Sequence, residues 1–258
     1  MRIITVATHK ERLFECFLES AKKHKIPLDI LGYGQEWKGF SWRWTLIYNH
    51  LVESDISDDE LLLITDAFDT LILKPAEVFE ERFKTSKSGL LFSRLTPLKE
   101  YYWIFQYYHR RVFGSDPIVN GGTYMGKCGK IKQFIKQLKY SETTDDQRLL
   151  TQLHKLIDME IDHSYSLMYH HIHWKVIQEE TPDTCVITFP GTSYSKELIQ
   201  SYGYSYKPTK LSFSISIAYR TLSHYIPFFY QDIIILSMLG YWFISNLISY
   251  GLYGLSEI

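Results

Sequence analysis

Apolar and polar residues along the chain alternate between short continuous apolar runs and longer stretches with helical spacing. Short apolar runs rich in Val and Ile predict buried strands, and apolar residues three or four positions apart predict amphipathic helices. The segment Glu60–Thr65 carries a continuous apolar run that ends at Asp66, which is typical of a central strand buried on both faces. We therefore predict strands at 3–7, 27–31, 60–65, 89–93, 118–125 and 184–189, and helices at 11–24, 42–52, 75–83, 100–113, 131–138 and 145–157.

This succession of strands and helices predicts an α/β fold with a largely parallel central sheet. Ligands bind to such sheets beyond the carboxyl ends of the strands. Those ends are expected at Thr8, at Asp66–Asp69 and around Asn120. We expect one domain of catalytic size over residues 1–204, followed by a C-terminal tail over residues 205–258.

The tail contains a hydrophobic stretch without any charged side chain, residues 233–256. As a helix it would be about 36 Å long, which exceeds the roughly 30 Å of a bilayer core. Lys207, Lys210 and Arg220 precede the stretch and only Glu257 follows it, so the positive-inside rule predicts a tail anchor with a cytosolic main domain. A buried or membrane-surface helix is the alternative, because several Ser and Asn side chains dilute the apolar character.

Composition narrows the choice of function. The chain has 28 basic and 29 acidic side chains among 258 residues, which argues against nucleic acid as a partner bound through a broad basic face. Three widely separated cysteines exclude a disulfide scaffold and fit a reducing compartment. The first apolar run, Ile3–Thr8, is shorter than that of a secretory signal, so we expect a cytoplasmic protein. The aromatic content of 16% suits a sugar or base site, but also suits core packing.

Two sets of side chains are candidates for metal binding. Asp66 and Asp69 lie three positions apart after a buried strand, where carboxylates can converge on a hard divalent cation or simply cap a helix. A second set could hold zinc, although its spacing matches no tight motif and partly exposed loop positions explain it better. Its members are Asp162, His163, His170, His171 and His173.

Five motifs then occur in order along the chain: TVAT (5–8), LGYGQEWKG (31–39), TDAFD (65–69), VNGGTYMG (119–126) and DDQ (145–147). Together they resemble the glycosyltransferase domain of procollagen lysyl hydroxylase/glucosyltransferase proteins and their bacterial and viral relatives, over roughly residues 1–195. The resemblance implies a GT-A fold, which is a nucleotide-diphospho-sugar transferase fold. It also implies a UDP-sugar as donor and a divalent metal, usually Mn²⁺.

Position by position, the resemblance makes Asp66 and Asp69 the metal ligands and places Asp145 and Asp146 near the donor sugar and the reaction centre. There a carboxylate can orient an acceptor hydroxyl or take its proton. Asn120, Gly121 and Gly122 match a turn at which the backbone approaches the donor sugar. The remaining donor-binding positions are the uridine contacts Thr5, Val6, Ala7 and Thr8, with Trp37 and Arg43 near the nucleotide.

One departure from the family pattern concerns the third metal ligand, a histidine that follows the last core strand in relatives. Here Thr188 or Phe189 stands in its place, and Lys196 remains available to contact phosphates as a point charge. One hypothesis is therefore a metal-dependent hexosyltransferase that moves galactose or glucose to a hydroxyl of a protein, a glycan or a lipid-linked sugar. The alternatives are an inactive fold that serves as a membrane-associated scaffold, and a nucleotide-sugar hydrolase.

Overall fold

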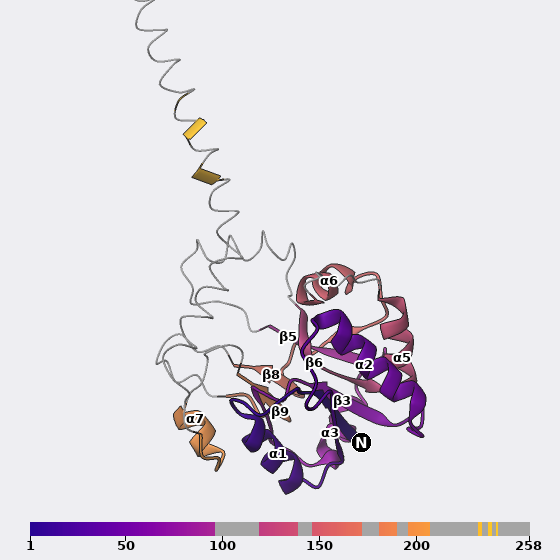
Figure 1. Cartoon of the computed structure of the whole chain (residues 1–258), viewed down its shortest axis with the longest axis vertical. Coiled ribbons are helices and arrows are strands. Elements are labelled where there is room, and N and C mark those ends of the chain that lie inside the picture. Colours follow the sequence, from indigo (N-terminus) through magenta and orange to yellow (C-terminus); the bar gives the residue numbers. More distant parts are fainter. Residues whose placement is uncertain are drawn as a thin grey trace, which may run out of the picture.

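The computed structural model describes residues 1–95, 119–138, 146–171, 181–189, 196–206, 232–233, 237–238 and 241. A six-stranded sheet carries helices on both of its faces (Figure 1). Its strand order is β2 (Leu28–Leu31), β1 (Arg2–Val6), β3 (Leu61–Thr65), β6 (Val119–Lys127), β5 (Leu90–Arg94), β7 (Glu160–Ile161). A second sheet consists of β4 (Thr70–Ile72), β9 (Val186–Thr188) and β8 (Met168–His170), in that order.

The α/β class predicted from the sequence is confirmed, and five of the six strands of the main sheet run in one direction, as expected for a largely parallel sheet; the exception is β6. Strand β6 runs antiparallel to both of its neighbours, β3 and β5. An apolar run carries no information on strand direction, so the sequence pattern could not show this. The reversal places the start of β6 beside the end of β3, where Thr65 pairs with Thr123 and the Asp66 N–H donates to the Gly122 carbonyl at 3.0 Å.

Alternation along the strands sends consecutive side chains into two separate cores. Ile3 joins the core under α1 (Phe14–Lys23) and α3 (Ala76–Phe83), while Ile4 joins the core on the other face. That second core is covered by α2 (Phe40–Glu53), α5 (Cys128–Gln137) and α6 (Asp146–Leu153). A third cluster joins the second sheet to α7 (Lys196–Ser201) and includes Leu71, Ile187 and Phe189.

Most predicted elements that fall on described residues are present, with ends shifted by a few positions. Strands β4, β7 and β8 and helix α7 were not predicted, because elements of two to six residues contain too few positions to establish a period. The helix predicted at 100–113 lies outside the described residues.

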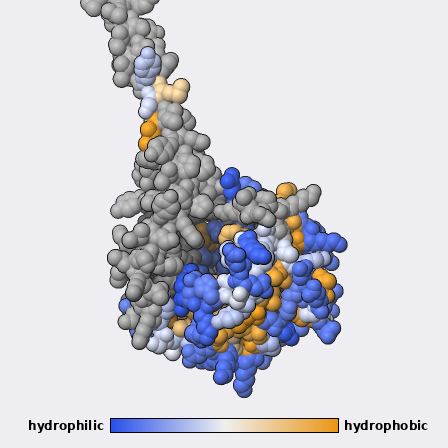
Figure 2. Space-filling view, in the orientation of Figure 1, coloured by the Kyte–Doolittle hydropathy of each residue, from blue (hydrophilic) through white to orange (hydrophobic). Residues whose placement is uncertain are grey.

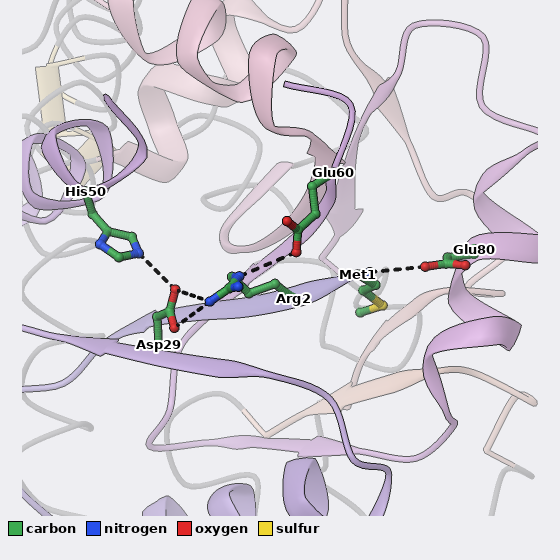
Figure 3. A network of polar contacts seen from close by, with 6 residues as sticks. All are labelled: Met1, Arg2, Asp29, His50, Glu60 and Glu80. Atoms are coloured by element: carbon green, nitrogen blue, oxygen red, sulfur yellow. Dashed lines mark hydrogen bonds and ion pairs between the residues drawn. The ribbon is translucent and has the colours of Figure 1, made fainter. Parts of the chain in front are cut away.

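The amino ends of the parallel strands are joined by a polar network (Figure 3). Arg2 of β1 donates to both oxygens of Asp29 in β2, at 3.0 and 3.1 Å, and lies 3.4 Å from Glu60 just before β3. His50 of α2 lies 2.9 Å from the same Asp29. Because these groups are partly exposed, each pair stabilises the fold by about 1 kcal/mol or less. The network lies at the end of the sheet opposite the candidate site.

Hydrophilic side chains cover most of the described surface seen in Figure 2, with smaller apolar areas between them. In the part of the chain that the structure describes, no helix is long and apolar enough to cross a bilayer. Most of the uncharged stretch 233–256 lies outside those residues, so the tail anchor stays a prediction. Cys16, Cys128 and Cys185 are all buried and form no disulfide.

Candidate active site

The two carboxylates of the D-x-x-D motif lie on the tight turn between β3 and β4. The Asp66 side chain is 43% exposed, and Asp69 is partly buried. Burial, and next the negative charge of Asp66, raise the pKa of Asp69 to about 7. Two carboxylates that repel each other in this way form a set of oxygen donors that favours a divalent cation.

Buried hydroxyl groups hold both ends of this turn. The Thr65 Oγ1, at the end of β3, lies 3.0 Å from the Thr70 Oγ1 at the start of β4 and 3.0 Å from the Thr123 Oγ1 on β6. Thr5 of β1 donates its hydroxyl to the Thr65 carbonyl at 2.7 Å. All four threonines are at most 2% exposed. These hydrogen bonds connect the end of β3 to β1, β4 and β6, which limits how far Asp66 and Asp69 can move.

Arg43, in the first turn of α2, joins the D-x-x-D motif to the D-D-Q motif. Its Nη1 donates to Asp66 Oδ1 at 2.8 Å, and its Nη2 donates to Asp146 Oδ2 at 2.5 Å and to the Gly121 carbonyl at 2.9 Å. Arg43 is 5% exposed and Asp146 is 8% exposed. Burial lowers the pKa of Arg43, but the charges of Asp146 and Asp66 raise it by more, so the net direction is upward. The guanidinium therefore stays charged and holds both acids.

The two glycines at the start of β6 make room for both carboxylates. A Cβ on Gly122 would lie 2.6 Å from Asp66 Oδ2, and a Cβ on Gly121 would lie 3.0 Å from Asp146 Oδ2. Neither distance permits a side chain unless the acid moves. The double glycine thus allows Asp66 and Asp146 to pack against neighbouring positions of one strand, with Arg43 between them.

Thr188, one of the two residues found where the resemblance expects a metal-binding histidine, contacts His170 on the neighbouring strand. The Nδ1 of His170 on β8 lies 2.7 Å from the Thr188 Oγ1 and 2.6 Å from the Asn120 Nδ2. Burial, with a smaller effect of His171, lowers the pKa of His170 to about 3, so the ring is neutral. Asn120 also accepts the Gly122 N–H at 2.6 Å, and through it His170 supports the glycine turn.

The remaining predicted site residues differ in how exposed they are and in whether they approach Arg43. Thr5, Val6 and Ala7 are buried, so of the TVAT motif only Thr8 has a partly exposed side chain. Trp37 is 46% exposed and packs edge-on against Phe40, whose ring faces the Arg43 guanidinium at 5.5 Å. Asp145 and the side chain of Lys196 lie outside the described residues.

The described part of the histidine-rich segment shows no grouping that would hold zinc. Asp162 is 4% exposed, and its carboxylate accepts the backbone N–H groups of Ser166, Leu167 and Met168, so it closes a loop. Across the described ranges, no three His, Cys, Asp or Glu side chains are grouped to hold a metal ion. His173 lies outside those ranges.

Two sets of contacts in the site were not predicted from the sequence. They are the contacts of Arg43 with the two acids and those of His170 with Asn120 and Thr188. Arg43 was expected near the nucleotide, but its contacts with both acids were not foreseen. Consecutive glycines inside a strand do signal a close approach by other groups, and this signal was present at Gly121 and Gly122. No sequence signal connected His170 with Asn120 and Thr188, because the contact joins three distant segments.

Comparison with known families decides what kind of domain carries this arrangement. The family model described as PLOD GT domain matches residues 1–178. The chain belongs to this family. The resemblance inferred from the five motifs is thereby confirmed. The matched range includes Asp66, Asp69, Asp146 and the glycine turn, and it ends before Thr188.

Among curated proteins, the multifunctional procollagen lysine hydroxylase and glycosyltransferase LH3 of Rattus norvegicus is 26% identical over 160 residues, covering 59% of this chain and 22% of that protein. The procollagen-lysine,2-oxoglutarate 5-dioxygenase of Drosophila melanogaster is 23% identical over 164 residues, with the same coverage of 59% and 22%. The chain therefore spans about a fifth of the length of these relatives.

Two solved structures show a distant similarity. A glycosyltransferase involved in the glycosylation of the major capsid of PBCV-1 has a TM-score of 0.48 and 13% identity, covering 78% of this chain and 98% of that one. The galactosyltransferase LgtC, in complex with donor and acceptor sugar analogs, has a TM-score of 0.44 and 13% identity, covering 83% of this chain and 99% of that one.

Proposed function

We propose that this member of the PLOD GT domain family is a metal-dependent GT-A glycosyltransferase that transfers a hexose from a UDP-sugar to an acceptor hydroxyl. The observation that carries the proposal is the convergence of Asp66, Asp69, Asp146 and the double glycine around one buried arginine. Galactose or glucose is favoured as the donor sugar by the family resemblance. The acceptor is a hydroxyl of a protein side chain, a glycan or a lipid-linked sugar.

The residues present fit a divalent cation such as Mn²⁺. Asp66 and Asp69 supply carboxylate oxygens, which are the donors that hard cations prefer, and their mutual repulsion is relieved when a cation binds. Such a cation would neutralise the charge that develops on the leaving UDP. With two carboxylates, water and diphosphate oxygens would have to complete the ligand set.

The other residues of the chain prepare the site for transfer. Gly121 and Gly122 leave room for the carboxylates of Asp146 and Asp66 to lie directly against the strand. Arg43 fixes the orientation of Asp146 through a short hydrogen bond. We assign to Asp146, together with Asp145 of the same motif, the role of orienting the acceptor hydroxyl or taking its proton.

A second candidate is an inactive fold that acts as a membrane-associated scaffold. It is favoured by Thr188, which occupies the position of the expected histidine ligand and is hydrogen-bonded to His170. A nucleotide-sugar hydrolase would use the same site without an acceptor. The three candidates differ in whether UDP binds and in whether a sugar is transferred.

Calorimetric titration of the full chain with UDP tests the proposal, with Mn²⁺ present and with EDTA instead. We expect binding in the presence of Mn²⁺ and little or none with EDTA, and loss of metal-dependent binding and turnover in Asp69→Asn. The control is Asp59→Asn, since Asp59 is 86% exposed and pairs with Lys127 on the surface. Absence of UDP binding under both conditions would favour the scaffold. Release of free sugar regardless of acceptor would identify a hydrolase.

We propose in addition that the tail associates the domain with a membrane, on the basis of the uncharged stretch 233–256. Deletion of the residues after about position 225 is expected to release the protein from the membrane fraction of expressing cells. If the truncated protein sediments with membranes as the full chain does, the tail is not the anchor.

A further inference from the structure

A cavity of about 430 Å³ opens at the far end of the small sheet. Four segments line it: the end of α1, the end of β4, the residues before β9, and the chain that follows α7. Its wall includes two lysines, a histidine and two tyrosines, namely Lys23, Lys74, His24, Tyr202 and Tyr204. Basic groups beside aromatic rings suit an anionic ligand that also has an apolar part.

This cavity is separate from the candidate active site. The D-x-x-D turn lies at the start of β4 and the end of β9, where the Phe189 N–H donates to the Asp69 carbonyl at 2.7 Å. The cavity lies at the opposite ends of these two strands, near Ile72 and Thr184. Three strand residues correspond to about 10 Å, so a ligand in the cavity would not contact the metal-binding carboxylates.

The charges around the cavity are predominantly positive. Asp183 is the one acid among the described residues that line it, and it is already paired with Lys74 at 2.7 Å and with Arg82 at 2.6 Å. Glu19 of α1 also acts on this region, since its charge contributes to raising the pKa of Tyr204, after burial. Burial, followed by the charges of Lys23 and Lys74, lowers the pKa of His24.

The same end of α1 carries further lysines. Lys22 and Lys25 are close to Lys23 in the sequence, and both are exposed. Within the described part of the chain, none of these three lysines forms an ion pair with a carboxylate. They offset the negative end of the helix dipole, but an exposed ammonium group in that position remains available to an anion. The Lys23 Nζ lies 5.7 Å from the centre of the Tyr204 ring.

The sequence that follows the cavity-lining residues indicates which kind of anion the cavity would bind. The chain passes Tyr204 and the buried Tyr206, and its sequence then continues through Lys207 and Lys210 to the uncharged stretch 233–256. Within that stretch, Ile233, Met238 and Tyr241 are 43%, 66% and 77% exposed. Basic side chains that precede an uncharged apolar stretch in the sequence are typical of segments that anionic membrane surfaces attract.

We propose that this cavity, with Lys23 at its wall and Lys22 and Lys25 beside it, binds the phosphate-bearing headgroup of an anionic lipid. A headgroup bound in the cavity would hold the domain against the bilayer with the small sheet toward the lipid. The candidate active site, at the other end of β4 and β9, would then be directed away from the headgroup layer. This assignment does not depend on the transferase being active.

Partition of the full chain into vesicles tests the proposal. Partition coefficients are measured on phosphatidylcholine vesicles and on vesicles that also contain phosphatidylserine, so that insertion of the uncharged stretch 233–256 cancels in their ratio. We expect a ratio well above one that falls about fivefold in Lys23→Gln, since a lysine near an anionic surface contributes about that factor. The matched control is Lys136→Gln, because Lys136 is exposed on α5, which packs on the opposite face of the main sheet.

A ratio near one for the unaltered chain would overturn the proposal. An equal fall in Lys23→Gln and Lys136→Gln would also overturn it, because the preference would then reflect net charge alone. Inorganic phosphate is the soluble probe. If phosphate perturbs the tyrosine fluorescence of the protein while the ratio stays near one, the cavity serves a free phosphate compound and the lipid assignment is wrong.

Discussion

Replacement of Arg43 by methionine tests whether the site depends on one buried cation. Methionine retains an unbranched apolar stem and fills part of the same volume, although the guanidinium carbon that lies 5.5 Å from the Phe40 ring and 5.4 Å from the Trp44 ring is removed. What is lost is the guanidinium, and with it the contacts to Asp66, Asp146 and the backbone of β6. The change therefore separates electrostatics from packing.

The expected loss of stability in Arg43→Met depends on how deeply its two acidic partners are buried. The Asp146 side chain is 10% exposed, and removing one partner of a buried ion pair costs about 3–5 kcal/mol because the other charge is left without compensation. The Asp66 side chain is 43% exposed, and its pair contributes about 1 kcal/mol or less. Arg43→Met should therefore lower the free energy of unfolding by about 3 kcal/mol or more, which corresponds to a fall in Tm of roughly 6 °C or more.

The assay is urea unfolding, followed by tryptophan fluorescence, on a double-mutant cycle. Asp146→Leu is combined with Arg43→Met, since replacing both members of a buried pair by apolar residues is often close to neutral. We expect the double variant to recover about 2 kcal/mol relative to the sum of the single losses. A loss below about 1 kcal/mol for Arg43→Met, or strictly additive losses, would show that the arginine does not compensate a buried charge.

Three further outcomes are expected around the same turn. Gly122→Ala places a methyl group 2.6 Å from Asp66 Oδ2 and should weaken metal-dependent UDP binding about tenfold by calorimetry, whereas unchanged affinity would mean that Asp66 is not a ligand. Thr65→Val removes a hydroxyl that lies 3.0 Å from those of Thr70 and Thr123, and should raise the apparent dissociation constant for Mn²⁺ while changing the circular dichroism spectrum little. An unaltered constant would show that the hydroxyl contacts do not position the turn. Because the pKa of Asp69 is raised to about 7, Mn²⁺ must displace a proton below that pH, so its apparent affinity should increase about tenfold per pH unit up to pH 7 and then level off. An Mn²⁺ affinity that stays constant between pH 5 and 8 would contradict the raised pKa of Asp69, and Asp69→Asn is the control.

The raised pKa of Asp69 also makes the stability of the metal-free protein depend on pH. The folded-state pKa of Asp69 lies above its ordinary value of 3.8, so between about pH 4 and pH 7 the folded protein binds the proton more tightly than the unfolded chain does. The contribution of Asp69 to stability is therefore present at low pH and is lost as the pH rises toward 7. Under the proposed function, a cation held by Asp66 and Asp69 would reverse this loss.

Much of the fold could be predicted because local patterns report burial. The run before Asp66 had to be a central strand, since its continuous apolar side chains require cover on both faces, and the structure buries them so. The family was evident from motifs that are local in the sequence, and the match over residues 1–178 confirms it. Strand direction was not determined in this way, because β6 has the same side-chain period in either orientation.

The family resemblance predicted which residues to expect in the site: the acids, the double glycine and Arg43. Only the tertiary structure decided how they meet, since Arg43, Asp66 and Asp146 lie on different elements and the energies that join them depend on burial. The contact of Thr188 with His170 likewise arises from the pairing of β8 with β9. The physical reason is that periodicity and turn chemistry act over a few neighbouring residues, whereas ion pairs and pKa values depend on what the completed fold places within a few ångströms.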